Sequence, residues 1–214
     1  MRPRLNRKEG QTILFIGDSI TDVNRLMPAY EPYGFGYVHF TTYNLLARYQ
    51  ELNLNIVNTG ISGNTVRDLA TRWDKDCLAY KPDILSIMIG VNDVWRQQAE
   101  EQDLPDAVYI EEYEATYGNL LLQAKAHCDS QLVLIEPFMF CQDKKNAMFK
   151  DLQAYIKVVN KLASEFDAVV VPLQKLINKQ LKHIPAERWS DDMVHPYLWA
   201  HAWISQRWLE ITRL

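Results

Sequence analysis

Five short apolar runs, separated by longer stretches, constrain the fold of this chain more than any other feature of its sequence. They cover residues 12–17, 54–59, 84–89, 131–135 and 168–171. Each run is nearly continuous in apolar residues, which is typical of strands that are buried on both faces of a parallel sheet. The pattern therefore predicts five parallel strands joined by crossover segments.

The stretches between the runs have the spacing of amphipathic helices. In residues 109–126 an apolar face alternates with glutamates that we expect to face solvent, Glu111, Glu112 and Glu114; the apolar face comprises Tyr109, Tyr113, Tyr117, Leu120, Leu121 and Ala124. Pro196 is in a helix-starting position and predicts a last helix that runs to the C-terminus. Crossover helices on both sides of a parallel sheet give an α/β fold, a three-layer α/β/α sandwich. The length of 214 residues, 48% of them hydrophobic, fits a single domain over residues 1–214.

Composition excludes several classes of partner and site. The formal net charge of -4 gives no electrostatic reason to expect nucleic acid or an anionic membrane as a partner. The 3 cysteines are scattered, which argues against a disulfide framework or a zinc site and suits a reducing compartment. Residues 1–10 lack the apolar run of a signal peptide, and no window has the roughly 18 consecutive apolar residues of a membrane span. We therefore expect a cytoplasmic protein.

Polar, glycine-rich segments follow three of the predicted strands. They are residues 17–19, 60–64 and 90–93. In open α/β sheets, ligands bind beyond the carboxyl ends of the strands. We therefore expect these three segments to lie side by side at one edge of the sheet.

Ser19, which follows the first run, is either a nucleophile or a helix-capping residue. A nucleophilic serine needs a base within hydrogen-bonding distance. His195 is the strongest candidate because it lies in a loop that can return to the same edge; the other histidines, predicted in helices or a polar loop, are His39, His127, His183 and His201. Asp192, three residues earlier, can accept a hydrogen bond from Nδ1–H of the imidazole, whereas we expect Asp191 to be a solvated neighbour or a helix cap.

An acyl-transfer site also needs donors for the oxyanion of its tetrahedral intermediate. The backbone N–H groups of Ser19 and Gly63 and the side-chain amide of Asn92 are candidates. Gly63 has an alternative interpretation as a plain turn glycine, and Asn92 as a helix cap. Ser62 is discounted as a nucleophile because residues 60–64 lack the second glycine of the G-x-S-x-G elbow.

These segments together resemble the conserved blocks of the GDSL/SGNH hydrolases. The blocks occur in the family's order as Gly-Asp-Ser-Ile-Thr at 17–21, Gly63, Gly-Val-Asn-Asp at 90–93 and Asp-Met-Val-His-Pro at 192–196. The resemblance implies a flavodoxin-like SGNH hydrolase fold. It also implies a Ser19, Asp192 and His195 triad and an oxyanion hole of Ser19, Gly63 and Asn92. Ile20 stands where the family has the leucine of one of its names, a change without chemical consequence.

Residues 58–69, 86–96 and 113–116 are similar to intracellular bacterial acetylxylan esterases of this family. That likeness implies removal of acetyl groups from xylo-oligosaccharides and assembly into a homo-oligomer. The acyl-transfer mechanism needs neither a metal nor an organic cofactor.

Trp95 and Trp189, with Arg96 nearby, are candidate substrate-binding residues because aromatic faces suit a sugar ring. The same rings would also wall a pocket for a short fatty acyl chain. The tryptophans near the C-terminus serve either a subunit interface or the core; they are Trp189, Trp199, Trp203 and Trp208.

Two other functions stay open from sequence alone. One is a lipid-directed esterase, lysophospholipase or thioesterase on the same catalytic frame. The other is a non-catalytic carbohydrate-binding protein, against which the complete Ser19, Asp192 and His195 set argues, since binding needs no proton relay.

Overall fold

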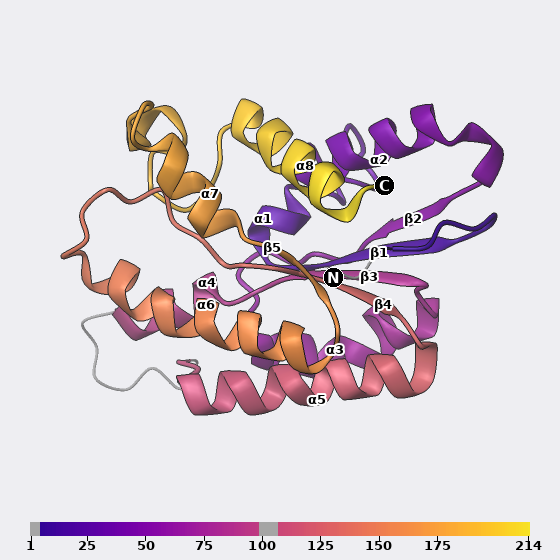
Figure 1. Cartoon of the computed structure of the whole chain (residues 1–214), viewed down its shortest axis with the longest axis horizontal. Coiled ribbons are helices and arrows are strands. Elements are labelled where there is room, and N and C mark those ends of the chain that lie inside the picture. The colour runs from indigo at the N-terminus through magenta and orange to yellow at the C-terminus, as the bar shows by residue number, and fades with distance from the viewer. Residues whose placement is uncertain (1–4, 99–106) are drawn as a thin grey trace.

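A five-stranded, fully parallel sheet forms the middle layer of the fold (Figure 1). The computed structural model describes residues 5–98 and 107–214. The strands are β1 (Thr12–Gly17), β2 (Asn55–Asn58), β3 (Ile84–Met88), β4 (Gln131–Ile135) and β5 (Val169–Val171). The five predicted strands are confirmed; β2, β3 and β5 are each shorter than their apolar runs by one or two residues.

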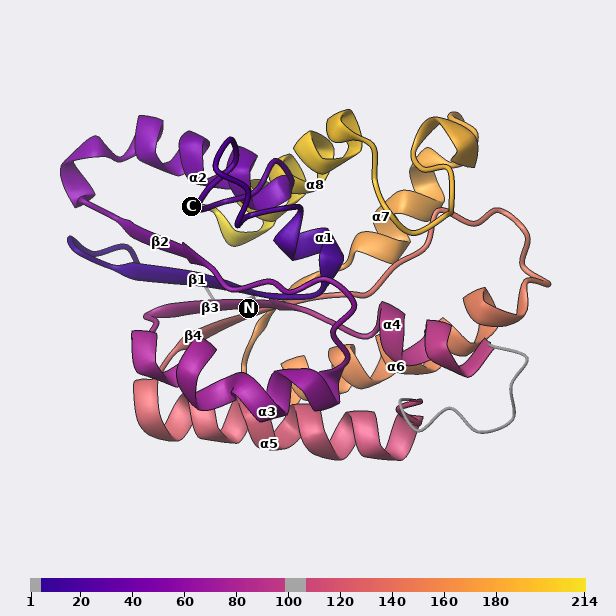
Figure 2. The same ribbon diagram turned by 180° about the vertical axis from the view of Figure 1, so that it is seen from behind.

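Helices cover both faces of the sheet, as the sequence pattern predicts (Figures 1 and 2). On one face lie α1 (Ser19–Asp22), α2 (Tyr37–Arg48), α7 (Leu173–Gln180) and α8 (Leu198–Thr212). On the other lie α3 (Val66–Asp76), α4 (Val91–Trp95), α5 (Ile110–Cys128) and α6 (Ala147–Glu165). Short 3-10 helices span Gln50–Leu52, Leu78–Tyr80, Arg96–Gln98 and Ala186–Arg188. Among the described residues, no helix is both long and apolar enough to cross a membrane.

The strand order β2-β1-β3-β4-β5 reverses direction between β1 and β3. After β1 the chain moves outward to β2, and later it moves the other way from β3 to β5. The loops that leave β1 and β3 therefore diverge at the carboxyl ends of these strands, which is where ligands bind in this class of fold. Gly17 pairs with Met88 at the ends of β1 and β3, so the residues that follow the two strands start level with each other.

The helix predictions need two corrections. Tyr109 precedes α5 and is 62% exposed, so it does not share the buried face of Tyr113 and Tyr117. Pro196 does not start α8, because Tyr197 still has extended backbone with ψ 161 and the first helical residue is Leu198.

Strand β3 lies at the centre of the core, and all five of its side chains are buried. Its one polar residue, Ser86, accepts a hydrogen bond from the indole Nε1–H of Trp208 at 3.0 Å. Trp208 is itself fully buried and packs against Phe15 of β1, with ring centroids 5.2 Å apart. This one indole therefore fixes α8 to the two central strands through both apolar packing and a hydrogen bond.

We expect Trp208→Ala to lower the free energy of unfolding by about 3–5 kcal/mol, since it leaves a large cavity beside β1 and β3. Chemical denaturation followed by circular dichroism measures the loss. Trp95→Ala is the matched control, because its indole is 40% exposed and its removal opens no buried cavity. Equal losses in the two variants would show that Trp208 does not anchor α8.

Candidate active site

Ser19 is the first residue of α1, and its hydroxyl is not used to cap that helix. Asp18 is the N-cap and accepts the backbone N–H of Ile20 at 3.0 Å. The Ser19 Oγ instead lies 2.9 Å from Nε2 of His195. The sequence left two roles open for Ser19, helix cap or nucleophile. Asp18 caps the helix, and the Ser19 hydroxyl is left to face His195.

Asp192 organises the loop that carries His195. Its Oδ1 accepts three hydrogen bonds, from the Ser190 hydroxyl at 2.8 Å, the Val194 N–H at 2.8 Å and the His195 N–H at 2.7 Å. Its Oδ2 lies 2.5 Å from Nδ1 of His195. Because a carboxylate only accepts, Nδ1 carries the proton, which leaves Nε2 as the acceptor for the Ser19 hydroxyl.

These contacts also set the charge of Asp192. Partial burial raises its pKa, but the hydrogen bonds from His195, the backbone N–H of Val194 and the Ser190 hydroxyl outweigh burial and lower the pKa to about 2. Asp192 is therefore an anion at neutral pH. The imidazole of His195 is 47% exposed, so the site is open to a dissolved substrate.

Two other carboxyl groups near the site are buried. Burial raises the pKa of Asp18 to about 7, although the hydrogen bond from Ile20 and the charge of His195 lower it in part. Burial likewise raises the pKa of Asp93 to about 7, although its hydrogen bond from the Val66 N–H opposes that shift. Only Asp192 among these carboxyl groups is fully ionised at neutral pH.

The second and third polar segments meet at a tight turn. The N–H of Asn64 donates to the carbonyl of Ile61 at 3.3 Å, and Gly63 has φ +80 at the third position of this turn. Asn92, inside α4, donates its side-chain amide to the carbonyl of Asn64 at 2.9 Å. Gly63 is thus a turn glycine and Asn92 is not a helix cap. Their roles as oxyanion donors stay predictions.

Trp95 and Arg96 border this group of residues. The Trp95 ring is partly exposed, with its centroid 6.1 Å from that of His195. Arg96 donates from Nη2 to the carbonyl of Gly63 at 2.6 Å. Contact of either side chain with a sugar stays a prediction.

The prediction that Trp189 lines the substrate pocket is wrong. Trp189 is fully buried, stacked on Phe140 with ring centroids 5.4 Å apart and packed against Trp199 at 4.3 Å. Its carbonyl accepts the N–H of Tyr197 at 2.8 Å, which closes the loop of Asp192 and His195. Trp189 therefore packs in the core beneath the loop of Asp192 and His195, and its side chain is not accessible to a ligand.

The remaining candidates have other partners. The hydroxyl and N–H of Ser62 donate to Oδ2 of Asp22 at 2.7 and 3.0 Å, so this serine is held by a carboxylate and not by a histidine. His201 is buried and accepts the N–H of Tyr37 at 3.3 Å; burial and the charge of His195 lower its pKa to about 4. Over the described ranges, no three His, Cys, Asp or Glu side chains form a group that would hold a metal ion.

Two residues of this region were not singled out from the sequence. Ser190 lies two positions before Asp192 and binds the same carboxylate, a spacing typical of local side-chain turns. Asp22 lies three positions after Ser19, which places both on one side of a helical turn. That spacing was the only signal available for Asp22.

Comparison with known proteins agrees with this geometry. The GDSL-like lipase/acylhydrolase family matches residues 15–203. An acetylxylan esterase of Geobacillus stearothermophilus is 40% identical over 208 residues, which cover 94% of this chain and 93% of that protein.

Solved structures show the same fold. The crystal structure of Axe2, an acetylxylan esterase from G. stearothermophilus, superposes with TM-score 0.91 at 38% identity, covering 97% of this chain and 96% of that one. Related Axe2 structures are of catalytic mutants in which a serine, an aspartate or a histidine is replaced by alanine. LAE5, an α/β hydrolase from the metagenome of Lake Arreo, has TM-score 0.90 at 33% identity, with 96% of each chain covered. The chain belongs to the GDSL-like lipase/acylhydrolase family.

Proposed function

We propose that this protein is a carboxylic ester hydrolase that removes acetyl groups from xylo-oligosaccharides or related acetylated sugars, with Ser19, His195 and Asp192 as its catalytic triad. The observation that carries the proposal is the unbroken series of contacts from Ser19 Oγ to His195 Nε2, 2.9 Å, and from His195 Nδ1 to Asp192 Oδ2, 2.5 Å. The acetylated sugar as substrate is supported by the identity of 40% to the Geobacillus acetylxylan esterase over nearly the whole chain.

In the first step His195 takes the proton of the Ser19 hydroxyl as Oγ attacks the acetyl carbonyl. The imidazolium that forms is stabilised by the anionic Asp192, which also holds the ring in the required tautomer. His195 then gives the proton to the departing sugar oxygen, which leaves an acetyl group on Ser19.

In the second step His195 takes a proton from water as the water oxygen attacks the acetyl carbonyl. The bond from the carbonyl carbon to Ser19 Oγ then breaks, Ser19 takes the proton back from His195, and acetate is released. The oxyanion of each tetrahedral intermediate is held by the N–H groups of Ser19 and Gly63 and by the amide of Asn92. Such donors are each worth on the order of 10²–10³ in rate. No metal or organic cofactor takes part.

The substrate contacts proposed are Trp95 and Arg96. The exposed ring of Trp95 beside His195 offers an aromatic face for a sugar, and Arg96 lies next to Gly63. A short-chain lipid esterase or thioesterase is the second candidate, because the same exposed indole would also contact an acyl chain.

We also propose a cytoplasmic homo-oligomer whose residues 1–214 act as one domain. One hydrophobic core cluster spans all three layers, which supports a single domain.

The oligomer is supported by a run of exposed apolar side chains. Its members are the consecutive Tyr197, Leu198 and Trp199, each at least 40% exposed, and the neighbouring Met193, which is also exposed. An apolar patch of this kind supports contact with a second copy of the chain.

We expect Ser19→Ala to lower kcat by at least about 10³-fold without changing the fold, since the hydroxyl is the attacking group. Hydrolysis of p-nitrophenyl acetate measures the loss, and thermal unfolding checks the fold. The wild type should react with a fluorophosphonate at Ser19. Activity near that of the wild type in Ser19→Ala would end the assignment, and lack of any labelling would favour a binding protein.

We expect Asp192→Asn to lower kcat by about 10⁴-fold, because an amide no longer holds Nδ1 of His195 as the proton carrier. Asp191→Asn is the matched control: the adjacent side chain is exposed and should leave kcat within about twofold of the wild type. Comparison of the two variants on the same acetate ester decides the partner of His195. A larger loss in the Asp191 variant would transfer the role to that residue.

We expect kcat/KM for p-nitrophenyl esters to fall by at least about tenfold between acetate and butyrate, since a pocket shaped for acetyl has no room for further methylenes. Acetate release from acetylated xylo-oligosaccharides, followed in parallel, tests the sugar. A profile that rises toward octanoate would instead select the lipid-directed alternative.

A further inference from the structure

The turn at residues 61–64 is built so that one of its peptide groups stays available. Ser62, at the second position of the turn, has negative φ, while Gly63 at the third has φ +80, which together define a type II turn. Among the hydrogen bonds of the described residues, the N–H of Gly63 has no acceptor. This N–H is the proposed oxyanion donor, and the inference below rests on that proposed function.

Types I and II of a β-turn differ by a flip of their central peptide, with about 170° of difference in φ at the third residue. In this turn the central peptide joins Ser62 to Gly63. A flip would therefore turn the Gly63 N–H to the opposite side and remove it from Ser19. The direction of the Gly63 N–H therefore depends on the contacts that hold the two flanking peptides, Ile61–Ser62 and Gly63–Asn64.

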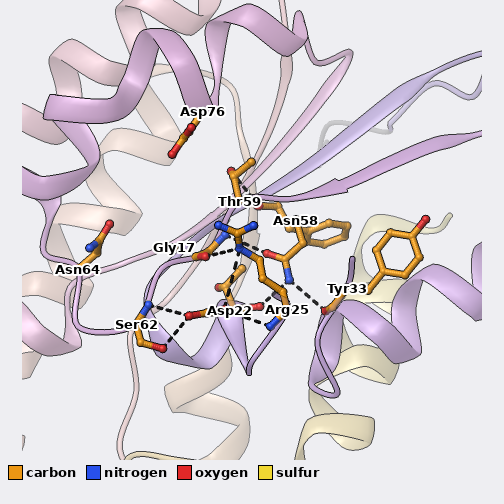
Figure 3. Close-up of polar contacts among 12 residues, drawn as sticks. Gly17, Asp22, Arg25, Tyr33, Asn58, Thr59, Ser62, Asn64 and Asp76 are labelled. Atoms are coloured by element: carbon orange, nitrogen blue, oxygen red, sulfur yellow. Dashed lines mark hydrogen bonds and ion pairs between the residues drawn. The ribbon is translucent and has the colours of Figure 1, made fainter. Parts of the chain in front are cut away.

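Both flanking peptides are held by side chains. Before the central peptide, the N–H and hydroxyl of Ser62 donate to Oδ2 of Asp22 at 3.0 and 2.7 Å (Figure 3). After it, the carbonyl of Gly63 accepts Nη2 of Arg96 at 2.6 Å. The central peptide thus lies between two fixed neighbours and makes no hydrogen bond to any residue that the structure describes.

Asp22 has a special place in this arrangement because it belongs to the same helical turn as Ser19. Helix α1 starts at Ser19 and ends at Asp22. The residue that presents the attacking hydroxyl and the residue that grips the turn are therefore linked by a single rigid turn of helix. The segment after β2 packs closely against this helix, since a Cβ added at Gly60 would lie 2.5 Å from the backbone N of Asp22.

We propose that Asp22 is a positioning residue that keeps the Gly63 N–H directed at the oxyanion site. It sets the orientation of the Ser62–Gly63 peptide relative to Ser19 and does not itself touch the substrate. The other oxyanion donor is tied to the same turn, since Asn92 donates to the carbonyl of Asn64 at 2.9 Å.

Every group that Asp22 holds is a donor. Oδ2 accepts both groups of Ser62, and Oδ1 accepts the N–H of Arg25 at 3.3 Å, as Figure 3 shows. An asparagine has the same shape but one acceptor and one donor, so Asp22→Asn places an amide NH₂ against a donor on one side or the other. The substitution loosens the grip on Ser62 without opening a cavity.

The test is a double-mutant cycle of Asp22→Asn and Gly63→Ala with steady-state kinetics on p-nitrophenyl acetate. An alanine fits at Gly63, since the nearest atom to its Cβ is Arg96 Nη2 at 3.9 Å, but it disfavours φ +80 and so favours the flipped turn. We expect Gly63→Ala to lower kcat by about 10²–10³-fold. Asp22→Asn alone should lower kcat on the order of tenfold, with KM within about twofold, because the donor acts in the transition state.

In the Gly63→Ala background the same Asp22→Asn change should lower kcat by less than about threefold, since the donor is already lost. Asp83→Asn is the control: Asp83 is 25% exposed against 18% for Asp22, and it also accepts a backbone N–H, that of Thr12 at 2.8 Å, at the amino end of β1 and away from the site. We expect kcat of the control within about twofold of the wild type. Ser62→Ala, which removes the hydroxyl and keeps the N–H, should give a smaller loss than Asp22→Asn.

The outcomes distinguish failure of the positioning role of Asp22 from failure of the oxyanion role of Gly63. Loss of kcat in Gly63→Ala, with none in Asp22→Asn, overturns the positioning role and leaves the proposed mechanism intact. An equal loss in both backgrounds, or a rise in KM in place of a fall in kcat, also overturns it as a general structural effect. Full kcat in Gly63→Ala removes the oxyanion role of Gly63 and this inference with it, while the Ser19→Ala result stays decisive for the triad.

Discussion

The parallel pairing of β1 with β3 sets the spacing on which the site depends. Gly17 and Met88 are partners at the carboxyl ends of these strands, so the chain leaves both strands at the same level. From the first end comes Ser19, and from the second comes Asn92, the second residue of α4. Because both strands are buried on both faces, a shift in their register would expose much of the core, so the spacing of these two groups is as stable as the fold.

The sheet sets the approximate positions of the site residues, and local polar contacts then fix their orientations. The Asp192 carboxylate uses one oxygen to shape its own loop and the other to orient His195. The turn of Gly63 is held by Asp22 on one side and Arg96 on the other. In both places a carboxylate accepts several hydrogen bonds, and such charge-assisted bonds are stronger than neutral ones.

Sequence patterns predicted the strands, the helix layers and the contact of Asp192 with His195, because each depends on local information. Apolar runs report burial directly, and Asp192 and His195 are neighbours in the chain, so their contact needs only one turn. Trp189 shows the limit of that approach. Its closeness in sequence to Asp192 suggested a pocket wall, but whether an indole faces ligand or core depends on packing against Phe140 and Trp199, which are distant in sequence or on another element.

Asp22 was missed for the opposite reason. Its partner Ser62 is 40 residues away, on a loop that reaches it only after β2 has paired with β1. A carboxylate three residues after a nucleophile is indistinguishable from a solvated helix residue until that loop is placed. Ser62 itself drew attention only as a rival nucleophile, whereas its hydroxyl is a donor that helps fix the turn.

The size of an acetyl group explains why so many side chains hold a single turn. A two-carbon acyl group offers little surface, so little binding energy is available from it to align the carbonyl with the donors after it binds. The donors must already be in place, because a misplaced dipole would have to be reoriented during the reaction. Because Asp22 and Arg96 fix the turn, its peptides are ordered when the protein folds and not when the substrate binds. Burial of the sheet supplies the free energy for that ordering. In the proposed mechanism the rigid turn acts on the acetyl carbonyl alone, and the exposed face beside Trp95 is left for the larger sugar.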